Sequence, residues 1–291
     1  MKIKKERIIQ MALCRINYFS DELKMKMGVN VIIPENKWGY SLEDRPTDYK
    51  YPTVWLLCGG GFDYTDWQRY TAVELFAAQH GVAVVMPGVY YSGYMDTTEG
   101  NFKYWTQISR ELPEYLRRMF PLSSKREDNF VAGFSMGGYG AFKWAMQQPE
   151  MFAACGTFAG AIGIVPRKRI PENERIGEPC LRDEVKKEGF CMLWAAFGSA
   201  ALLRNTPNDN LFMLENRLKE KCELPEFYIA IGSEDPTANE GYKVMDTMRK
   251  MGLEFKEIRD QGKHDWEYCN RHIESFLNWL PIKNAFKMEA Q

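Results

Sequence analysis

Short runs of apolar residues alternate along the chain with longer stretches in which apolar residues recur every three or four positions. The short runs are rich in β-branched and aromatic residues, which is typical of buried strands. They cover Val29–Ile33, Val54–Leu57, Val82–Met86, Phe130–Phe134, Phe152–Phe158, Phe227–Ile231 and Glu254–Ile258. Strands that alternate with helices in this way predict an α/β fold, with a mostly parallel central sheet flanked by helices.

The longer stretches predict helices between these strands. The stretch from Trp105 to Met119 has helical spacing, and Pro113 within it predicts a kink. The final helix takes its apolar face from Trp266, Ile273, Phe276, Leu277 and Leu280. Residues 160–223 lack the rhythm of strands, which favours a helical insertion. No internal repeat is visible, so we expect one domain over residues 11–285.

Composition narrows the function classes. The 291 residues carry a net charge of -1, so there is no electrostatic case for nucleic-acid binding. The N-terminal lysines accompany no apolar segment long enough for a signal peptide or a membrane span, so no membrane association is expected. The seven cysteines are odd in number and form no Cys-x-x-Cys pair, which favours reduced thiols and a cytoplasmic location.

Residues 133–138 form a G-x-S-x-G motif with the sequence Gly-Phe-Ser-Met-Gly-Gly. The motif follows the apolar run 129–132 and opens a helix-compatible stretch. In this setting it predicts a nucleophile elbow, a tight strand-to-helix turn that lifts a serine hydroxyl clear of the sheet edge. Gly133 and Gly137 lack the Cβ atoms that would clash beside such a turn. Ser135 is therefore the candidate nucleophile.

A serine nucleophile needs a base, and the chain has three histidines. In the fold that carries this elbow the chain order is nucleophile, acid, histidine, so the base follows Ser135 and His80 is excluded. His80 precedes Gly81 at a predicted helix end, where a polar contact is its expected role. His264 lies in a polar loop after a predicted strand, where this architecture presents catalytic groups. We therefore favour His264 over His272, which we expect on the surface of the final helix.

The acid is expected between the serine and the histidine, after a strand and before a helix. Asp235 follows the predicted strand 226–232 and precedes a helix-like segment. Its carboxylate would accept the Nδ1 proton of His264, which fixes the tautomer and stabilises the imidazolium. Glu234 is the nearest rival, and a plain helix-capping role is the alternative for Asp235.

Backbone amides are expected to hold the oxyanion. The predicted strand 53–58 runs into three glycines and Phe62, and the glycines would let the backbone approach the substrate oxygen. We assign the amides of Gly60 and Met136 to this role, the latter at the start of the helix behind Ser135. Gly61 is the alternative to Gly60, and a glycine turn without catalytic duty is the alternative to both. Gly61, Phe62 and Trp266 are the predicted substrate contacts.

Seven short stretches of the chain match a known family in sequence and in order. They are Trp55–Gly60, Asp66–Trp67, Val84–Pro87, Glu111–Pro113, Ala132–Ala141, Gly232–Asp235 and Gly262–Trp266. From about Met11 to Leu280 the chain resembles the esterase family of α/β-hydrolases that includes tributyrin esterases, S-formylglutathione hydrolases, feruloyl and acetylxylan esterases and mycolyltransferase antigens. The tributyrin-esterase branch, which acts on short acyl esters, is the most similar. The resemblance implies the α/β-hydrolase fold, with Ser135, Asp235 and His264 at the positions of the catalytic triad.

The chain departs from this family at one position, because the family usually has a His-Gly pair where this chain has Cys58 and Gly59. That histidine generally supports the oxyanion loop, so the departure bears on loop geometry and substrate preference. A redox-sensitive or nucleophilic Cys58 is one hypothesis, and a small buried thiol is the favoured one because no histidine is placed to activate it. Family members tend to start near Met11, so residues 1–10 are interpreted as an extension or a misassigned start.

A metal site is the alternative use of His264, which would join Cys269 and His272 as ligands. Such a site competes with the triad for the same imidazole, so no metal and no organic cofactor is predicted.

The predicted function is that of a serine carboxylesterase that hydrolyses short-chain acyl esters, with acetyl or feruloyl esters of carbohydrates among the candidates. An acyl-enzyme intermediate is expected. An acyltransferase or an S-formylglutathione-type thioesterase would use the same triad, and a non-catalytic binding protein is the least favoured alternative. The expected partner is a small-molecule or oligosaccharide ester, and the resemblance implies a homo-oligomer. The insertion 160–223 would cover the active site and set selectivity.

Overall fold

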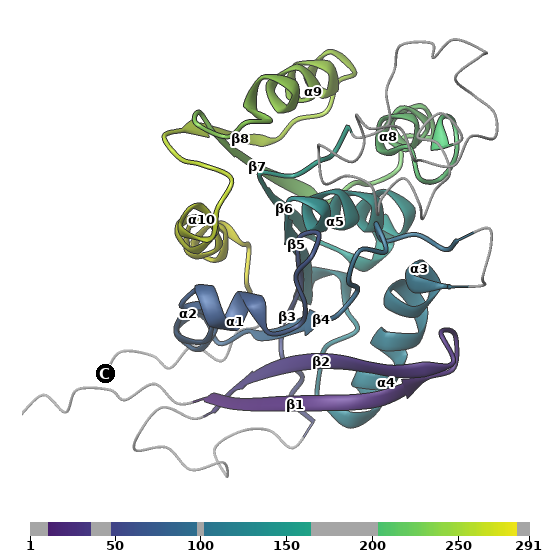
Figure 1. Cartoon of the computed structure of the whole chain (residues 1–291), viewed down its shortest axis with the longest axis vertical. Helices are drawn as coiled ribbons and strands as arrows, with labels where there is room; N and C mark the ends of the chain where they lie inside the picture. Colours follow the sequence, from purple (N-terminus) through teal and green to yellow (C-terminus); the bar gives the residue numbers. More distant parts are fainter. Residues whose placement is uncertain (1–10, 36–47, 98–101, 164–202, 284–291) are drawn as a thin grey trace, which may run out of the picture.

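The computed structural model describes residues 11–35, 48–97, 102–163 and 203–283. Its centre is an eight-stranded sheet in the order β1-β2-β4-β3-β5-β6-β7-β8 (Figure 1). The strands are β1 (Met11–Ser20), β2 (Met25–Pro34), β3 (Thr53–Leu57), β4 (Ala83–Pro87), β5 (Asn129–Phe134), β6 (Ala154–Phe158), β7 (Glu226–Gly232) and β8 (Lys256–Asp260). The strands from β4 to β8 in this order are parallel, whereas β2 is antiparallel to both β1 and β4. The predicted mostly parallel α/β sheet is confirmed.

The structure adds one strand to those predicted and shifts the ends of the others, most of all at β2, which begins at Met25 rather than Val29. β1 is absent from the sequence prediction, and it pairs with β2 along its whole length at one edge of the sheet. Exposed and buried positions alternate in its second half, so no run of buried apolar residues marks it. β6 begins at Ala154 rather than Phe152, and β8 continues past the predicted end at Ile258 to Asp260. β8 is the other edge strand, and its partly exposed residues give its end no hydrophobic signal.

Helices cover both faces of the sheet (Figure 1). One face is covered by α1 (Asp66–Tyr70), α2 (Val73–His80) and α10 (Trp266–Trp279). The other is covered by α4 (Leu112–Met119) and α5 (Met136–Gln147), and α8 (Asn210–Lys219) packs on α5. The helix α9 (Ala238–Lys250) follows β7. None of the helices in the described ranges is both long and apolar enough to pass through a lipid bilayer.

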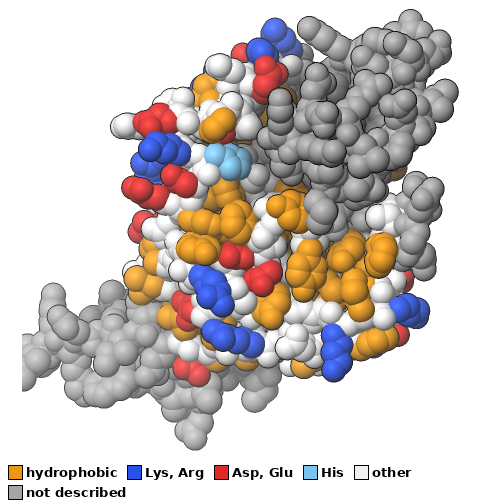
Figure 2. All heavy atoms as spheres, viewed as in Figure 1, with side chains coloured by type: hydrophobic (Ala, Val, Ile, Leu, Met, Phe, Trp, Pro, Cys, Tyr) orange, Lys and Arg blue, Asp and Glu red, His pale blue; other side chains and the backbone are white. Residues whose placement is uncertain are grey.

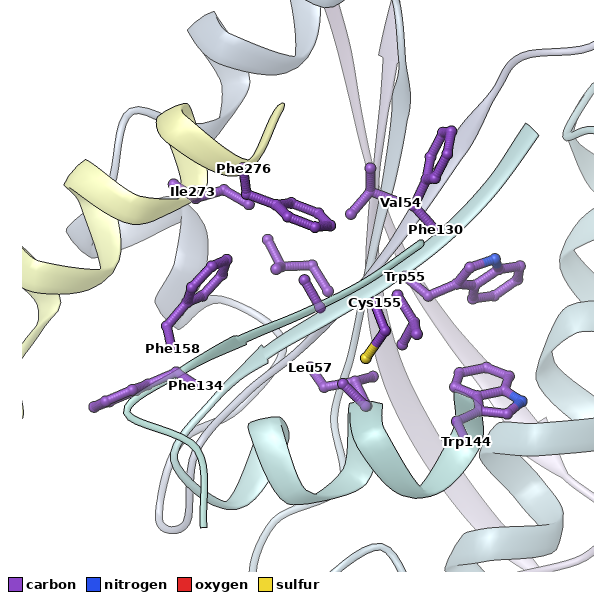
Figure 3. Packing of buried hydrophobic residues seen from close by; sticks show 14 of the residues in the cluster. Val54, Trp55, Leu57, Phe130, Phe134, Trp144, Cys155, Phe158, Ile273 and Phe276 are labelled. Atoms are coloured by element: carbon purple, nitrogen blue, oxygen red, sulfur yellow. The ribbon is translucent and has the colours of Figure 1, made fainter. Parts of the chain in front are cut away.

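Large aromatic side chains fill the space between the sheet and its helices, as Figure 3 shows for the centre of the molecule. Trp55 of β3 packs on Trp144 of α5, with ring centroids 5.6 Å apart. On the opposite face Phe158 of β6 packs on Phe276 of α10, with centroids 5.9 Å apart. All four side chains are fully buried, so both helices that flank the centre are held by apolar burial.

The kink predicted at Pro113 takes a different form. α3 (Tyr104–Thr106) continues through the π-helical segment Gln107–Glu111 directly into α4. Pro113 lies in the first turn of α4, and the wide π turn just ahead of it accommodates a residue that cannot donate a backbone hydrogen bond. The Gln107 amide in this turn is buried and donates to the Tyr18 hydroxyl of β1.

The predicted insertion is described only in part. Of residues 160–223, the stretch 164–202 lies outside the described residues, and with it Trp194, Phe197 and Leu202. The described remainder contains α8, whose N-terminus is capped by the Asp209 carboxylate. The insertion, its place over the active site and the domain bounds stay predictions, and residues 1–10 also lie outside the described part.

Candidate active site

Ser135 occupies a sharp turn between β5 and α5. Its backbone has φ 54° and ψ -116°, a conformation that a non-glycine residue adopts only when its surroundings impose it. A Cβ on Gly133 would overlap the Gly137 carbonyl, and a Cβ on Gly137 would overlap the Leu57 carbonyl of β3. The Ser135 amide donates to the Phe158 carbonyl at 3.0 Å. The two glycines therefore let β3, β5 and α5 meet closely beneath a serine that remains partly exposed.

Asp235 and His264 come from the loops that follow β7 and β8, which are neighbours in the sheet. His264 Nδ1 lies 2.7 Å from Asp235 Oδ2. The two loops are joined by a hydrogen bond from the Glu234 amide to the Gly262 carbonyl, 2.9 Å long. The His264 side chain is 30% exposed, whereas that of Asp235 is 0% exposed. A buried carboxylate thus holds an imidazole that remains accessible.

The Asp235 carboxylate is surrounded by donors. Its Oδ1 accepts from both the backbone amide and the hydroxyl of Thr237, each at 2.7 Å. Burial alone would raise the pKa of Asp235, but the hydrogen bonds from His264 and Thr237 outweigh burial and hold that pKa below its ordinary value. The contacts to Thr237 and to His264 use different oxygens. The N-cap residue of α9 is Thr237 rather than Asp235, so Asp235 holds the turn before that helix, and its role as the catalytic acid stays a prediction. Glu234 is exposed and accepts from Gln261 Nε2 at 2.9 Å.

The aromatic ring next to Ser135 in the sequence packs beside the His264 imidazole. Phe134, the residue before Ser135, has its ring centroid 4.8 Å from that of the His264 imidazole. Among the described residues the hydrogen bond of His264 is to Asp235, and none joins its ring to the Ser135 hydroxyl. Such bonds are often long without substrate and tighten when it binds.

The glycine loop after β3 lies beside the N-terminus of α5. A Cβ on Gly60 would lie 3.7 Å from Met136 Sδ and 3.4 Å from the Tyr91 ring. The Met136 amide is in the first turn of α5, where a helix offers no acceptor, and within the described ranges no residue accepts from the Gly60 amide. Gly61 has φ 82° and lies close to the Tyr91 hydroxyl. Two such amides on adjacent segments can bind a developing oxyanion.

Comparison with known protein families and sequences shows which family the chain belongs to. The model of a family described as "Putative esterase" matches residues 20–279. The chain belongs to this esterase family. It is 26% identical over 270 residues to an acetyl esterase of Caldicellulosiruptor saccharolyticus, an alignment that covers 93% of this chain and 98% of that protein.

Solved structures agree with this assignment. A fluorophosphonate-binding serine hydrolase of Staphylococcus aureus has a TM-score of 0.78 and 28% identity, covering 94% of this esterase and 99% of that chain. An S-formylglutathione hydrolase of the same organism has a TM-score of 0.76 and 28% identity, covering 93% and 99%. The chain is therefore a carboxylic ester hydrolase with the α/β-hydrolase fold, which confirms the fold and the enzyme class predicted from the sequence.

Two of the predicted substrate contacts, Phe62 and Trp266, form an aromatic wall beside the site together with Phe134 and Tyr70. Trp266 meets Phe62 at 5.1 Å and Phe134 at 5.3 Å between ring centroids, and Tyr70 stacks on it at 5.4 Å. The Trp266 indole N–H is buried, and no described residue accepts from it. Figure 2 shows hydrophobic side chains gathered in broad groups over one face of the molecule, with acidic and basic side chains between them. Trp266 thus packs the wall, and its contact with substrate, like those of Gly61 and Phe62, stays a prediction.

The other two histidines have separate partners. His80 ends α2, with Nδ1 2.8 Å from the Phe76 carbonyl and Nε2 3.1 Å from Asn278 Oδ1, so its predicted polar contact at a helix end is confirmed. The expectation that His272 lies on the helix surface is wrong, because it is 3% exposed. His272 lies three residues after Cys269 and four before Phe276, so helical spacing places it on the same buried face as these two residues. This position in the helix decides its burial, although a histidine side chain is polar.

Cys58 is a buried thiol, as the favoured interpretation predicted, at 1% exposure. Burial raises the pKa of Cys58 to about 12, which opposes a thiolate nucleophile. Its Sγ faces the carbonyls of Phe62 at 3.5 Å and Pro87 at 3.9 Å. Cys269 is also buried, and in the part of the chain that the structure describes no three His, Cys, Asp or Glu side chains gather as metal ligands.

The sequence prediction missed the loop between β4 and α3, which supplies two tyrosines to the surroundings of the glycine loop. Tyr91 lies over Gly60 and Gly61, and the Tyr94 hydroxyl donates to the Cys58 carbonyl. Neither belongs to a motif, so no local signal in the sequence distinguishes them from other aromatic residues.

Proposed function

We propose that the esterase hydrolyses short-chain acyl esters through a covalent acyl-enzyme on Ser135. The observation that carries the proposal is the hydrogen bond between the buried Asp235 carboxylate and the accessible His264 imidazole, at strand ends close to the strained Ser135 turn. An imidazole held at Nδ1 in this way is oriented to act as a base through its other nitrogen.

The proposed mechanism has two halves. His264 takes the Ser135 proton as the serine oxygen attacks the ester carbonyl, while the Asp235 carboxylate stabilises the imidazolium. The amides of Gly60 and Met136 bind the oxyanion of the tetrahedral intermediate. His264 then protonates the leaving alcohol as its C–O bond breaks. Water, deprotonated by His264, next attacks the acyl-enzyme and releases the acid and free Ser135.

A small acyl group is proposed because two relatives aligned over nearly their whole length are named for small acyl esters, an acetyl esterase and an S-formylglutathione hydrolase. The second relative also favours a thioester as a second candidate substrate. The same machinery suits it, because a thiolate leaves more easily than an alkoxide and places a smaller demand on proton transfer from His264.

The experiment is hydrolysis of p-nitrophenyl esters from acetate to octanoate by wild type and by Ser135→Ala. We expect the highest kcat/KM on the short chains and a loss of roughly 10⁴-fold or more in the variant. S-formylglutathione assayed in parallel separates the two substrates, and product analysis with added alcohols separates hydrolysis from acyl transfer. Turnover retained by Ser135→Ala, or absent from wild type, would overturn the proposal.

We also propose that the enzyme works in the reducing environment of the cytoplasm. This rests on the described cysteines, which are all free thiols, Cys58, Cys155 and Cys269 among them buried.

A further inference from the structure

A tyrosine and a lysine are buried behind the glycine loop. Tyr94 is 0% exposed, and its backbone is in the left-handed region with φ 54°, which bulky residues rarely adopt. Lys143 on α5 is 1% exposed, although a buried amine loses its hydration. Both placements are unfavourable in isolation, so the contacts of these two side chains must compensate for them.

Lys143 holds the tyrosine loop against α5. Its Nζ donates to the Tyr94 carbonyl and to Asn208 Oδ1, both at 2.6 Å, and lies 4.1 Å from the centroid of the Trp105 ring. Burial lowers the pKa of Lys143, and either protonation state of the amine can donate these two hydrogen bonds. The ring of Tyr94 also lies against α5, because a Cβ on Gly140 would overlap it.

Tyr94 in turn holds the start of the glycine loop. Its hydroxyl donates to the Cys58 carbonyl at 2.7 Å, whereas the Cys58 thiol is a weak donor with longer contacts of 3.5 Å and 3.9 Å. Because a peptide unit is planar, a fixed Cys58 carbonyl also fixes the direction of the Gly59 amide. The next peptide unit carries the Gly60 amide.

We propose that Tyr94 and Lys143 are positioning residues that set the separation between the two oxyanion donors. One donor, Met136, begins α5, and Lys143 lies about two turns further along the same helix. The other donor, Gly60, is in the loop that Tyr94 holds. Two hydrogen bonds in series, from Lys143 to Tyr94 and from Tyr94 to Cys58, therefore connect the segments that carry the donors. This inference rests on the proposed function, since the separation matters only if an oxyanion forms there.

The test compares two tyrosine variants. Tyr94→Phe removes the hydroxyl that donates to Cys58. Tyr51→Phe is the matched control, because the Tyr51 hydroxyl is also buried and donates to a backbone carbonyl, that of Pro34, at 2.6 Å, and Tyr51 precedes the opposite end of β3. On p-nitrophenyl acetate we expect kcat to fall roughly 10- to 100-fold in Tyr94→Phe with KM changed less than about threefold. In Tyr51→Phe kcat should stay within about twofold of wild type.

A second readout isolates the oxyanion. Phenylboronic acid adds to a serine oxygen and becomes tetrahedral, so it resembles the intermediate rather than the substrate. Its Ki should rise in Tyr94→Phe by about the same factor by which kcat/KM falls, and it should not change in Tyr51→Phe. A general loss of packing would not produce this proportionality.

Lys143→Met is the second variant, because it leaves the Tyr94 hydroxyl in place and removes only its support. We expect kcat to fall roughly 3- to 30-fold, again with a parallel rise in Ki. The inference is contradicted if Tyr94→Phe folds and has the same kcat and Ki as Tyr51→Phe. If Tyr94→Phe does not fold, the inference is contradicted when Lys143→Met has the kcat and Ki of wild type. Failure of the proposed function is a different result, because Ser135→Ala would then retain activity.

Discussion

Two histidine–aspartate pairs lie near the carboxyl ends of β7 and β8, and burial is reversed between them. In the pair of His264 and Asp235 the carboxylate side chain is 0% exposed and the imidazole 30%. In the pair of His272 and Asp260 the imidazole is 4% exposed and the carboxylate 39%. The nitrogen–oxygen distances are 2.7 Å and 3.2 Å. The same two residue types therefore make an accessible imidazole in one place and a buried one in the other.

The surroundings of each histidine explain the difference. His272 Nδ1 lies 3.0 Å from the Tyr228 hydroxyl, and the Tyr268 ring centroid is 4.2 Å from that of the imidazole. Burial lowers the pKa of His272, so this imidazole is favoured as a neutral group in the core. In the other pair the carboxylate is the enclosed group and the imidazole meets the aromatic wall. The pairing of a histidine with an aspartate therefore does not by itself distinguish the proposed catalytic pair; the accessibility of its imidazole does.

Removal of the accessible imidazole is expected to have the largest effect. His264→Ala should lower kcat on p-nitrophenyl acetate by roughly 10⁴- to 10⁶-fold, because the proposed base is lost. Its melting temperature should change little, since the side chain is partly exposed. His272→Leu is the matched variant in the other pair and should retain kcat within about threefold per folded molecule. Loss of activity in a folded His272→Leu together with activity in His264→Ala would reverse our assignment of the pairs.

The two carboxylates offer the next comparison. Asp235→Asn should lower kcat by roughly 10³- to 10⁴-fold, because an amide that donates to Nδ1 favours the wrong tautomer of His264. Asp260→Asn makes the same chemical change in the other pair, and its kcat should stay within about threefold. Steady-state kinetics on one ester measures both. Equal losses in the two variants would contradict a separate role for Asp235.

The hydrogen bond between Asp235 and His264 could be predicted from the sequence because the elbow motif fixes a chain order. Ser135 is singled out by the glycines two residues to either side of it. Asp235 follows a strand rich in β-branched and aromatic residues, and His264 lies in a polar loop after the last predicted strand. The parallel centre of the sheet was predictable for a similar reason, since its buried strands are continuous apolar runs. Contacts that depend on local spacing or on chain order are thus within reach of a single sequence.

What the sequence could not predict depends on tertiary packing. His272 is polar, and its burial follows from Tyr228 and Tyr268, which come from another strand and from one turn earlier in its own helix. The edge strand β1 has no buried apolar run, so it gave no signal. Tyr94 and Lys143 are far apart in the chain, and only the folded structure brings Lys143 to Tyr94 and Tyr94 to Cys58.

The buried histidine should dominate stability, whereas the accessible one is expected to dominate catalysis. His272→Ala should lower the free energy of unfolding by about 2 to 4 kcal/mol, because it leaves a cavity and removes one hydrogen-bond partner of the Tyr228 hydroxyl. His80→Ala is the control, since His80 also has two polar contacts but is partly exposed, and it should lose less than about 1 kcal/mol. Urea unfolding followed by circular dichroism gives both values. Equal losses would show that burial does not distinguish these histidines.

The smallest expected effect is a pH dependence of stability that separates the two pairs. Burial lowers the pKa of His272 in the folded state below its ordinary value of 6.5, so the unfolded chain binds this proton more readily. The stability contribution is therefore complete above about pH 6.5 and is lost as the pH falls through the folded pKa, with a slope below about 1.4 kcal/mol per pH unit. Asp260 opposes this shift and Arg271 adds to it. The lowered pKa of Asp235 also makes stability fall with falling pH, but only near and below the ordinary Asp value of 3.8.

Urea unfolding at a series of pH values between 5 and 8 measures this dependence. The free energy of unfolding should change with pH in wild type and in Asp235→Asn, and should not change in His272→Gln. If the slope persists in His272→Gln, another group titrates in this range, and the neutral buried imidazole is not its source.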